Sequence, residues 1–220
     1  VQGLSRLEYR GYDSAGITVV QDNSLYTYKE KGRLENLQSQ LADKNLSGSI
    51  GIGHTRWATH GVPSHSNAHP HMNDTKTLSL VHNGIIENYQ EIKAMLSSKG
   101  YTFSSDTDSE VIVHLLDYYY EGNMILAIQK VTKQLQGSYA LCIVSTDRPD
   151  TIYITRKDSP IVIGTDNHAS FAASDIPAIL DYTKEVYFLE DYEIAKLRPT
   201  KILFYDRSGN TIEKEKVTIP

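Results

Sequence analysis

The sequence predicts an α+β protein in which two antiparallel sheets pack face to face, with helices on the outside. Strand-like segments are grouped near the start of the chain and again after residue 138, and segments with helical spacing follow one another between residues 89 and 137. Grouped strands and helices are typical of α+β architectures, whereas a doubly wound parallel sheet alternates a strand with a helix. No composition shift or linker divides the 220 residues, so we expect one domain over residues 1–220.

The first part of the chain predicts a hairpin between two short helices. Leu4 and Leu7 have helical spacing, and the Asp22-Asn23 pair separates two alternating segments, as in a hairpin. The expected elements are a helix within residues 1–10, strands at 15–21 and 25–31, a helix at 33–41 and a strand that ends near residue 56.

The middle of the chain predicts a strand followed by three helices. The expected elements are a strand at residues 78–82 and helices at 89–99, at 107–120 and from 123 to just before Gly137. Asn88 with Glu91, and Thr107 with Glu110, have capping-box spacing, which would place Asp108 in the first turn of a helix.

The last third of the chain predicts mostly short strands separated by turns. Asp175 with Pro177 marks the start of one short helix among them. The expected strands lie at residues 139–145, 151–156, 161–164, 170–173, 186–189, 193–197 and 201–205, with a final strand after the turn at 206–210.

Composition excludes several classes of protein. The net charge of −5 and the absence of a clustered basic face argue against nucleic acid as a partner. The longest apolar run, at residues 139–144, is far shorter than the roughly twenty residues that cross a bilayer, so no membrane association is expected. Cys142 is the single cysteine, which rules out an internal disulfide and fits a cytoplasmic location.

The chemistry of the chain is concentrated in residues 49–71, where a strand runs into a loop rich in histidine and proline. Arg56, Trp57, Thr59 and His60 follow one another where the strand pattern stops, and strand ends commonly present functional side chains. An arginine offers a planar fork of donors that suits a carboxylate or a phosphate. The stretch therefore predicts recognition of an anion.

A metal site is an alternative interpretation of this stretch, because it contains five histidines. Their spacing matches no standard ligand pattern and no cysteine lies nearby, so we expect no metal and no cofactor. Cys142 lies within an apolar strand, where burial removes the reactive thiolate, and we expect a structural role for it.

Two further motifs each allow two interpretations. Asn83-Gly84 is either an ordinary turn after a strand or the amide and backbone N–H pair of an oxyanion hole. Asp108 is either a helix-capping residue or the partner of a cationic ligand group. Arg56 with Asp108 would suit an amino acid, since one could hold its carboxylate and the other its ammonium group.

Five motifs along the chain resemble a known family. They are Leu7-Glu-Tyr-Arg-Gly-Tyr-Asp-Ser-Ala-Gly16, Gly53-His-Thr-Arg-Trp-Ala-Thr-His-Gly61, Asn67-Ala-His-Pro-His71, Val81-His-Asn-Gly-Ile-Ile-Glu-Asn-Tyr89 and Asp106-Thr-Asp108. Together they closely resemble the glutaminase domain of the glucosamine-6-phosphate synthases. These enzymes are also called glutamine–fructose-6-phosphate aminotransferases, and they belong to the class-II glutamine amidotransferases. The related amidophosphoribosyltransferases usually have glutamine in place of Tyr12 and Tyr-Ser in place of Trp57-Ala58, so these positions favour the sugar-making enzyme.

The resemblance implies an N-terminal-nucleophile hydrolase fold, a four-layer sandwich of two antiparallel sheets between helical layers, and hydrolysis of L-glutamine. It implies that Arg56, Thr59 and His60 bind the α-carboxylate, that Asp108 binds the α-ammonium group, and that Asn83 and Gly84 form the oxyanion hole. It also implies a gating role for Trp57, a loop position near the pocket for His69, and positions for Arg10 and Gly11 beside the nucleophile.

The family uses an N-terminal cysteine as its nucleophile, and this chain begins instead at Val1. We therefore expect an inactive glutaminase domain that lacks its N-terminal strand and nucleophile, and also the two sugar-isomerase domains. Those domains would bind fructose 6-phosphate and form the homo-oligomer. The alternatives are the glutaminase domain of another class-II amidotransferase, a non-catalytic glutamine-binding module and, last, a metal-binding protein.

Overall fold

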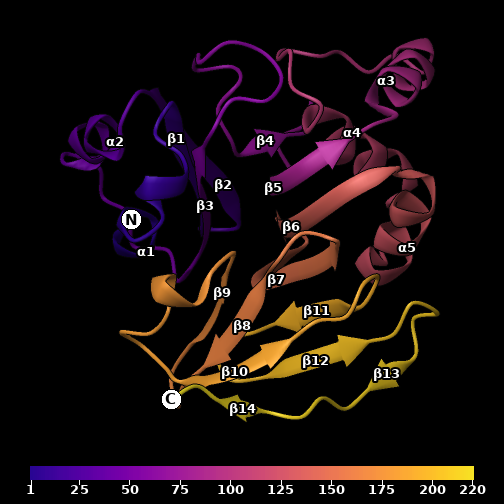
Figure 1. Cartoon of the computed structure of the whole chain (residues 1–220). Helices are drawn as coiled ribbons and strands as arrows, with labels where there is room; N and C mark the ends of the chain where they lie inside the picture. The colour runs from indigo at the N-terminus through magenta and orange to yellow at the C-terminus, as the bar shows by residue number, and fades with distance from the viewer.

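In the computed structural model, which describes residues 1–220, the chain forms three antiparallel sheets with helices packed against them (Figure 1). The helices are α1 (Gln2–Ser5), α2 (Leu34–Leu41), α3 (Tyr89–Ser98), α4 (Glu110–Tyr119) and α5 (Met124–Gln134), with 3₁₀ turns η1 (Glu8–Arg10) and η2 (Ile176–Ala178). The strands are β1 (Ser14–Gln21), β2 (Ser24–Lys31), β3 (Ile50–Arg56), β4 (His71–Met72), β5 (Leu78–Ile86), β6 (Gly137–Ser145), β7 (Arg148–Lys157), β8 (Val162–Thr165), β9 (Ser170–Ala173), β10 (Glu185–Phe188), β11 (Ile194–Leu197), β12 (Ile202–Tyr205), β13 (Thr211–Ile212) and β14 (Val217–Thr218).

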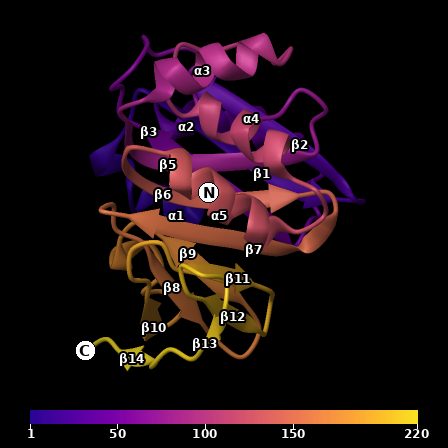
Figure 2. The same cartoon turned by 90° about the vertical axis from the view of Figure 1, so that its right-hand side faces the viewer.

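The largest sheet has seven strands in the order β13-β12-β11-β7-β6-β5-β4. Helices α3, α4 and α5 cover one of its faces, as Figure 2 shows from that side. Their apolar stripes and the facing side chains of β5 and β6 form the main core of twenty buried residues, which includes Leu80, Ile86, Leu115 and Tyr139. This core holds the strand that carries Asn83 and Gly84 in a defined register.

Two smaller sheets share the opposite face of the large one. The first sheet, with the strand order β2-β1-β3, packs through Ile50 and Ile52 against Val81 and Val144 of the large sheet. The second sheet, with the order β14-β10-β8-β9, packs through its apolar face against β6, β7 and β11. Helix α2 covers the outside of the first small sheet, and the η2 segment covers the outside of the second. The expected sandwich with outer helices is confirmed.

The second layer differs from the single sheet that was expected. It is divided into two sheets, because β3 and β9 each end their sheet and do not pair with one another. Two strand edges are therefore left on either side of a gap in this layer.

Most expected elements are confirmed, including the hairpin. Asp22 and Asn23 both have positive φ angles (52° and 56°), the backbone of the tight turn that matches strand twist. Asn123 caps α5, since its side chain accepts a hydrogen bond from Leu126 N. Within residues 1–10 the single helix divides into α1 and η1. The short strands β4 and β14 were not expected.

Both predicted capping boxes are wrong. The Asn88 side chain bonds to Gln134 O and Gln136 N, where it ties α3 to the start of β6. Helix α4 begins at Glu110, so Asp108 lies before the helix and not in its first turn. The Glu110 carboxylate accepts bonds from the Ser104 and Ser105 nitrogens. Distant backbone groups thus compete successfully for side chains that have capping spacing.

The interpretation of Asn83-Gly84 as a turn is also wrong. Strand β5 continues through both residues to Ile86 and pairs with β6 along its whole length.

No helix of the structure has both the length and the apolar character that a membrane span requires.

Candidate active site

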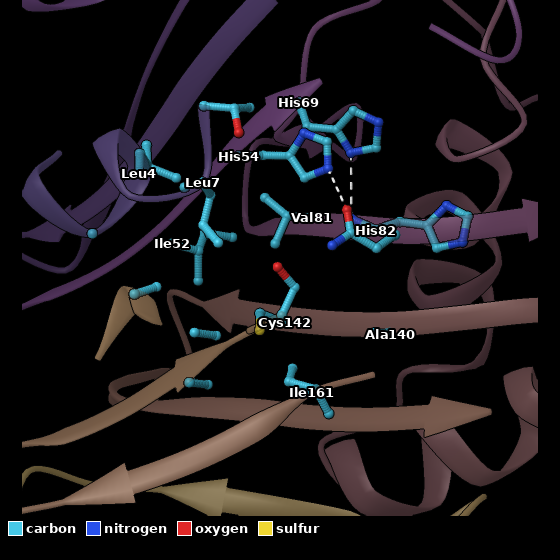
Figure 3. Close-up of a pocket in the computed structure, with 18 of the residues that line it drawn as sticks. Leu4, Leu7, Ile52, His54, His69, Val81, His82, Ala140, Cys142 and Ile161 are labelled. Atoms are coloured by element: carbon cyan, nitrogen blue, oxygen red, sulfur yellow. Dashed lines mark hydrogen bonds between the residues drawn. The ribbon is translucent and has the colours of Figure 1, made fainter. Parts of the chain in front are cut away.

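A cavity of about 750 Å³ lies where the two smaller sheets approach the large one. Its lining comes from the N-terminal segment, β1, β3 and the loop after it, β5, the residues just before α4, β6, β7 and the segments around β9. Figure 3 shows His54 and His69 above Val81, with Cys142 and Ala140 on the strand below. Of the ten residues singled out from the sequence, nine line this cavity: Arg10, Arg56, Trp57, Thr59, His60, His69, Asn83, Gly84 and Asp108. Segments far apart in the chain therefore meet at one site.

Arg56 is the last residue of β3, and its side chain is buried. Its Nη2 donates to the carbonyl oxygens of His60 and Gly61, the latter at 3.0 Å, so the guanidinium holds the loop that follows the strand. Its Nη1 lies 3.6 Å from Asp13 Oδ1 and has no hydrogen-bond partner. This buried nitrogen therefore faces the Asp13 carboxylate without a hydrogen bond, and the arginine itself lines the cavity.

Asp108 is buried beside this loop. Its Oδ2 accepts a 2.7 Å hydrogen bond from Ile86 N, and its Oδ1 lies 3.6 Å from Nδ1 of the half-buried His60. Thr59 is exposed and its hydroxyl lies 3.3 Å from His60 Nδ1. Burial makes an unneutralised carboxylate costly, so a cationic ligand group would be favoured here.

Asn83 and Gly84 lie together near the open edge of β5. Strand β4 pairs only with the Ser79 and Leu80 end of β5, so the rest of this edge has no strand partner. Residues two apart on a strand point their N–H groups to the same edge. His82 N donates to His69 Nδ1 (3.3 Å) and Ile86 N donates to Asp108, so the Gly84 N–H points to the same open edge between them.

Gly84 is needed at this position for steric reasons. Its φ of +126° is unfavourable for any residue with a side chain. A Cβ at Gly84 would also lie 2.2 Å from the carbonyl oxygen of Ser138 on the neighbouring strand. The site therefore places a side-chain amide next to an exposed backbone N–H, and groups of these two kinds can stabilise an oxyanion.

The half-buried His54 and the buried His69 and His71 pack against one another beside Asn83. His54 stacks on His69 with ring centroids 4.1 Å apart, and His69 contacts His71 edge to face. Burial lowers the pKa of His54 to about 4 and lowers the pKa values of His69 and His71 well below the usual range. At neutral pH these rings are uncharged. No group of three His, Cys, Asp or Glu side chains is arranged to hold a metal ion.

The remaining expected residues surround the entrance or support the site. Trp57 is 60% exposed and packs edge to face on Tyr12. Arg10 is exposed, and its Nη1 lies 3.6 Å from Asp175 Oδ2. Gly11 does not line the cavity: it packs against the backbone of β3, where a Cβ would lie 2.8 Å from the Arg56 carbonyl carbon. It supports the arginine from behind.

Cys142 lies in the middle of β6 and lines the cavity floor. Burial raises the pKa of its thiol to about 12, so it is protonated at neutral pH. The structural role expected for this cysteine fits its surroundings, since no basic side chain is bonded to it.

Sequence reasoning missed two residues that organise the site. Asp13 lies beside Arg56, and His54 Nε2 lies 2.7 Å from Asn83 Oδ1. Both come from motifs that were recognised, but neither residue was singled out. Their partners are 43 and 29 residues away in the chain, as their numbers show, so no local spacing reveals the pairs.

Comparison with known proteins shows the family to which this chain belongs. A family model described as a glutamine amidotransferase domain matches residues 54–181, more than half of the chain. The chain belongs to the glutamine amidotransferase family. This amidotransferase chain is similar to glutamine–fructose-6-phosphate aminotransferases (isomerizing), for example that of Clostridium acetobutylicum, with 52% identity over 98% of the chain and 35% of the relative. For Methanosarcina acetivorans the identity is 47%, over 98% of the chain and 36% of the relative. The chain thus spans about a third of the length of these curated relatives.

Two solved structures share the fold of this amidotransferase domain. One is the glutamine phosphoribosylpyrophosphate amidotransferase of B. subtilis with ADP and GMP, with a TM-score of 0.78, 24% identity and coverage of 96% of this chain and 46% of that chain. The other is described as the allosteric regulatory enzyme of purine biosynthesis, with a TM-score of 0.79, 25% identity and coverage of 95% and 46%. These likenesses confirm the N-terminal-nucleophile sandwich.

Proposed function

We propose that this chain is the glutaminase domain of a glutamine–fructose-6-phosphate aminotransferase. In this proposal the domain hydrolyses L-glutamine to glutamate, and the ammonia is used elsewhere in the enzyme to make glucosamine 6-phosphate from fructose 6-phosphate. The similarity to glutamine–fructose-6-phosphate aminotransferases, at 52% and 47% identity, supports the assignment. So do Tyr12 and Trp57-Ala58, where the related amidophosphoribosyltransferases usually differ.

The observation that carries the proposal is the meeting of Arg56, Asp108 and the Asn83-Gly84 pair around one cavity. L-Glutamine has a group for each of them. The α-carboxylate would pair with the Arg56 guanidinium, with Thr59 and His60 beside it. The α-ammonium group would pair with Asp108. The carboxamide oxygen, which becomes negative during hydrolysis, would receive the Asn83 amide and the Gly84 N–H.

The proposed nucleophile is a cysteine on a strand that precedes Val1. The unpaired edges of β3 and β9 and the cavity near them support this arrangement, since an inserted strand would pair with both edges and join the two small sheets. The α-amino group would take the thiol proton as the sulfur attacks the carboxamide carbon, and would give that proton to the departing ammonia. Water would then cleave the thioester to release glutamate and restore the thiol. Arg10 and Gly11 would border this strand.

In the full-length enzyme, this glutaminase domain would supply ammonia to further domains. We propose that the exposed Trp57 gates the path of ammonia, and that His69 shapes the pocket. Sugar-isomerase domains would bind fructose 6-phosphate and assemble the enzyme as a homo-oligomer. The lone Cys142 fits a reducing compartment, so we propose the cytoplasm as its location.

The test is product analysis with the full-length enzyme, L-glutamine and fructose 6-phosphate. Equal amounts of glutamate and glucosamine 6-phosphate are expected. Glutamate without the amino sugar would favour another class-II amidotransferase. Glutamine binding without any glutamate would favour a non-catalytic binding module. Calorimetric titration of the 220-residue chain with glutamine shows whether the site binds glutamine at all, and the Arg56→Ala variant is the control that should bind more weakly.

A further inference from the structure

The side chain of Asn83 makes one hydrogen bond within the protein, and its partner is His54. Its Nε2 lies 2.7 Å from Asn83 Oδ1, so the bond links β3 to β5. Figure 3 draws this bond as a dashed line from the labelled His54. The two strands belong to different sheets, so the bond also joins the two layers of the sandwich at the site. The other ring nitrogen of His54, Nδ1, is buried and has no partner.

These contacts determine which nitrogen of His54 carries the proton. A neutral imidazole has one N–H, and an amide oxygen only accepts. With the proton on Nε2, His54 donates to Asn83 and leaves a bare Nδ1 acceptor. With the proton on Nδ1, a buried N–H would lack an acceptor, and two acceptors would face each other at Nε2 and Oδ1. Since an unpaired buried donor is costly, the Nε2–H form is favoured.

The same bond sets the orientation of the Asn83 amide. When Oδ1 accepts from His54, the amide nitrogen lies on the opposite side of the side chain. A flipped amide would turn its oxygen away from His54, and that oxygen would repel a developing oxyanion instead of stabilising it. The Asn83 amide can therefore stabilise an oxyanion only in the orientation that the bond to His54 sets.

The ring of His54 is held in place from its other side. His69 stacks on it with an interplanar angle of 18°, and the Nδ1 of His69 accepts from His82 N on β5. The position of His54 is thus tied to the strand that carries Asn83.

We propose that His54 is a positioning residue for the oxyanion hole, acting by donating its Nε2–H to Asn83 and so directing the Asn83 amide nitrogen at the substrate oxygen. This inference rests on the proposed function, in which Asn83 stabilises an oxyanion. It assigns to His54 a role that is separate from substrate binding, because the residue acts only through Asn83.

A double-mutant cycle in the full-length enzyme tests this role. Asn83→Ala is expected to lower kcat for glutamate release about 10²–10³-fold. His54→Leu is expected to lower kcat by at least about fivefold, and by no more than Asn83→Ala does, with little change in KM. In the Asn83→Ala background, His54→Leu should cost almost nothing further, since its partner is already gone.

Two polar variants provide a matched comparison. The amide nitrogen of glutamine reaches about as far as the Nε2 of histidine, and that of asparagine about as far as Nδ1. His54→Gln should therefore restore most of the lost kcat, whereas His54→Asn should not. Thermal unfolding of each variant separates a loss of stability from a loss of kcat.

The tautomer is measured without any assay of activity. Long-range ¹H–¹⁵N spectra of the 220-residue protein should show His54 as neutral with the proton on Nε2 at pH 7. A proton on Nδ1 would overturn the proposal even if the leucine variant failed to fold.

The kinetic outcomes separate the two levels of inference. If Asn83→Ala leaves kcat unchanged, the proposed oxyanion hole is wrong and the role of His54 falls with it. If Asn83→Ala lowers kcat but the effects of the two substitutions add, or if Gln and Asn at position 54 behave alike, the oxyanion hole stands and the positioning role is wrong.

Discussion

Asp108 accepts a 2.7 Å hydrogen bond from Ile86 N, two residues beyond the candidate oxyanion donor Gly84. One carboxylate oxygen of Asp108 is therefore engaged with the strand that carries Asn83 and Gly84. Its other oxygen lies 3.6 Å from Nδ1 of His60, in the loop that follows β3. Through this residue, the proposed ammonium site and the proposed oxyanion hole share one support.

Asp108→Asn should weaken the use of glutamine much more than it weakens folding. Asparagine keeps an oxygen that can accept from Ile86 N, but it cannot neutralise an ammonium group. Loss of one partner of a desolvated charge pair costs about 2–5 kcal/mol, so kcat/KM for glutamine should fall roughly thirtyfold or more. Steady-state kinetics of the full-length enzyme measures this, and an unchanged kcat/KM would contradict the assignment.

Asp108→Ala provides the comparison, since it also removes the acceptor for Ile86 N. A buried N–H without a partner costs about 1–3 kcal/mol, so the free energy of unfolding should fall by that amount relative to the asparagine variant. Urea titration of both variants gives the difference.

Asn83→Ala should lower kcat while KM for glutamine hardly changes. An oxyanion donor strengthens its bond only as charge develops, and its loss adds about 2.7–4 kcal/mol to the barrier. Kinetics over a range of glutamine concentrations separates the two constants. A raised KM with a constant kcat would identify Asn83 as a ground-state contact.

Arg56→Lys should raise KM for glutamine, although the charge is kept. A lysine cannot hold the carbonyls of His60 and Gly61 and also donate to a carboxylate in the same plane. We expect at least about a tenfold increase, the equivalent of about 1.4 kcal/mol. Arg198→Lys is the matched control, since Arg198 pairs with Asp150 away from the cavity, and its KM should equal that of the wild type. Equal KM values for both variants would exclude Arg56 from substrate binding.

Gly84→Ala should destabilise the protein by more than Gly100→Ala. Both glycines have positive φ angles (126° and 93°), so each substitution strains the backbone, which costs of order 1–3 kcal/mol. At Gly84 the new methyl group would also meet Ser138 O, whereas nothing lies within 4 Å of a Cβ at Gly100. Urea unfolding of the two variants should therefore differ by about 1–3 kcal/mol. Equal losses of stability would show that the strand shifts to accept the methyl group.

The 220-residue chain should release no glutamate above background. Cys142 is its one thiol, and its pKa of about 12 leaves almost no thiolate at pH 7–8. An oxyanion hole alone accelerates hydrolysis only about 10³–10⁴-fold over water, which an ordinary assay does not detect. Cys142→Ser in the full-length enzyme should retain kcat. Robust glutamate release by the 220-residue chain, lost on that substitution, would make Cys142 the nucleophile.

The sequence by itself determined the local elements and the class of the fold. The Asp22-Asn23 hairpin, the Asn123 cap and most strand and helix positions followed from alternation, helical spacing and turn residues. These signals act between neighbours in the chain, so they can be found without the structure. The motifs of residues 53–61, 81–89 and 106–108 resemble a known family, and that resemblance supplied the proposed roles of the site residues.

Only the tertiary structure decided how those parts are used. Asn88 has the spacing of a helix-capping residue and Asp108 was expected in the first turn of a helix, yet each side chain bonds to a distant backbone group. Asn83-Gly84 continues a strand because β6 pairs with it along its whole length. His54 reaches Asn83 only because two sheets pack face to face at this point. Such contacts depend on strand register and layer packing, where hydrogen-bond satisfaction of buried groups outweighs local preference.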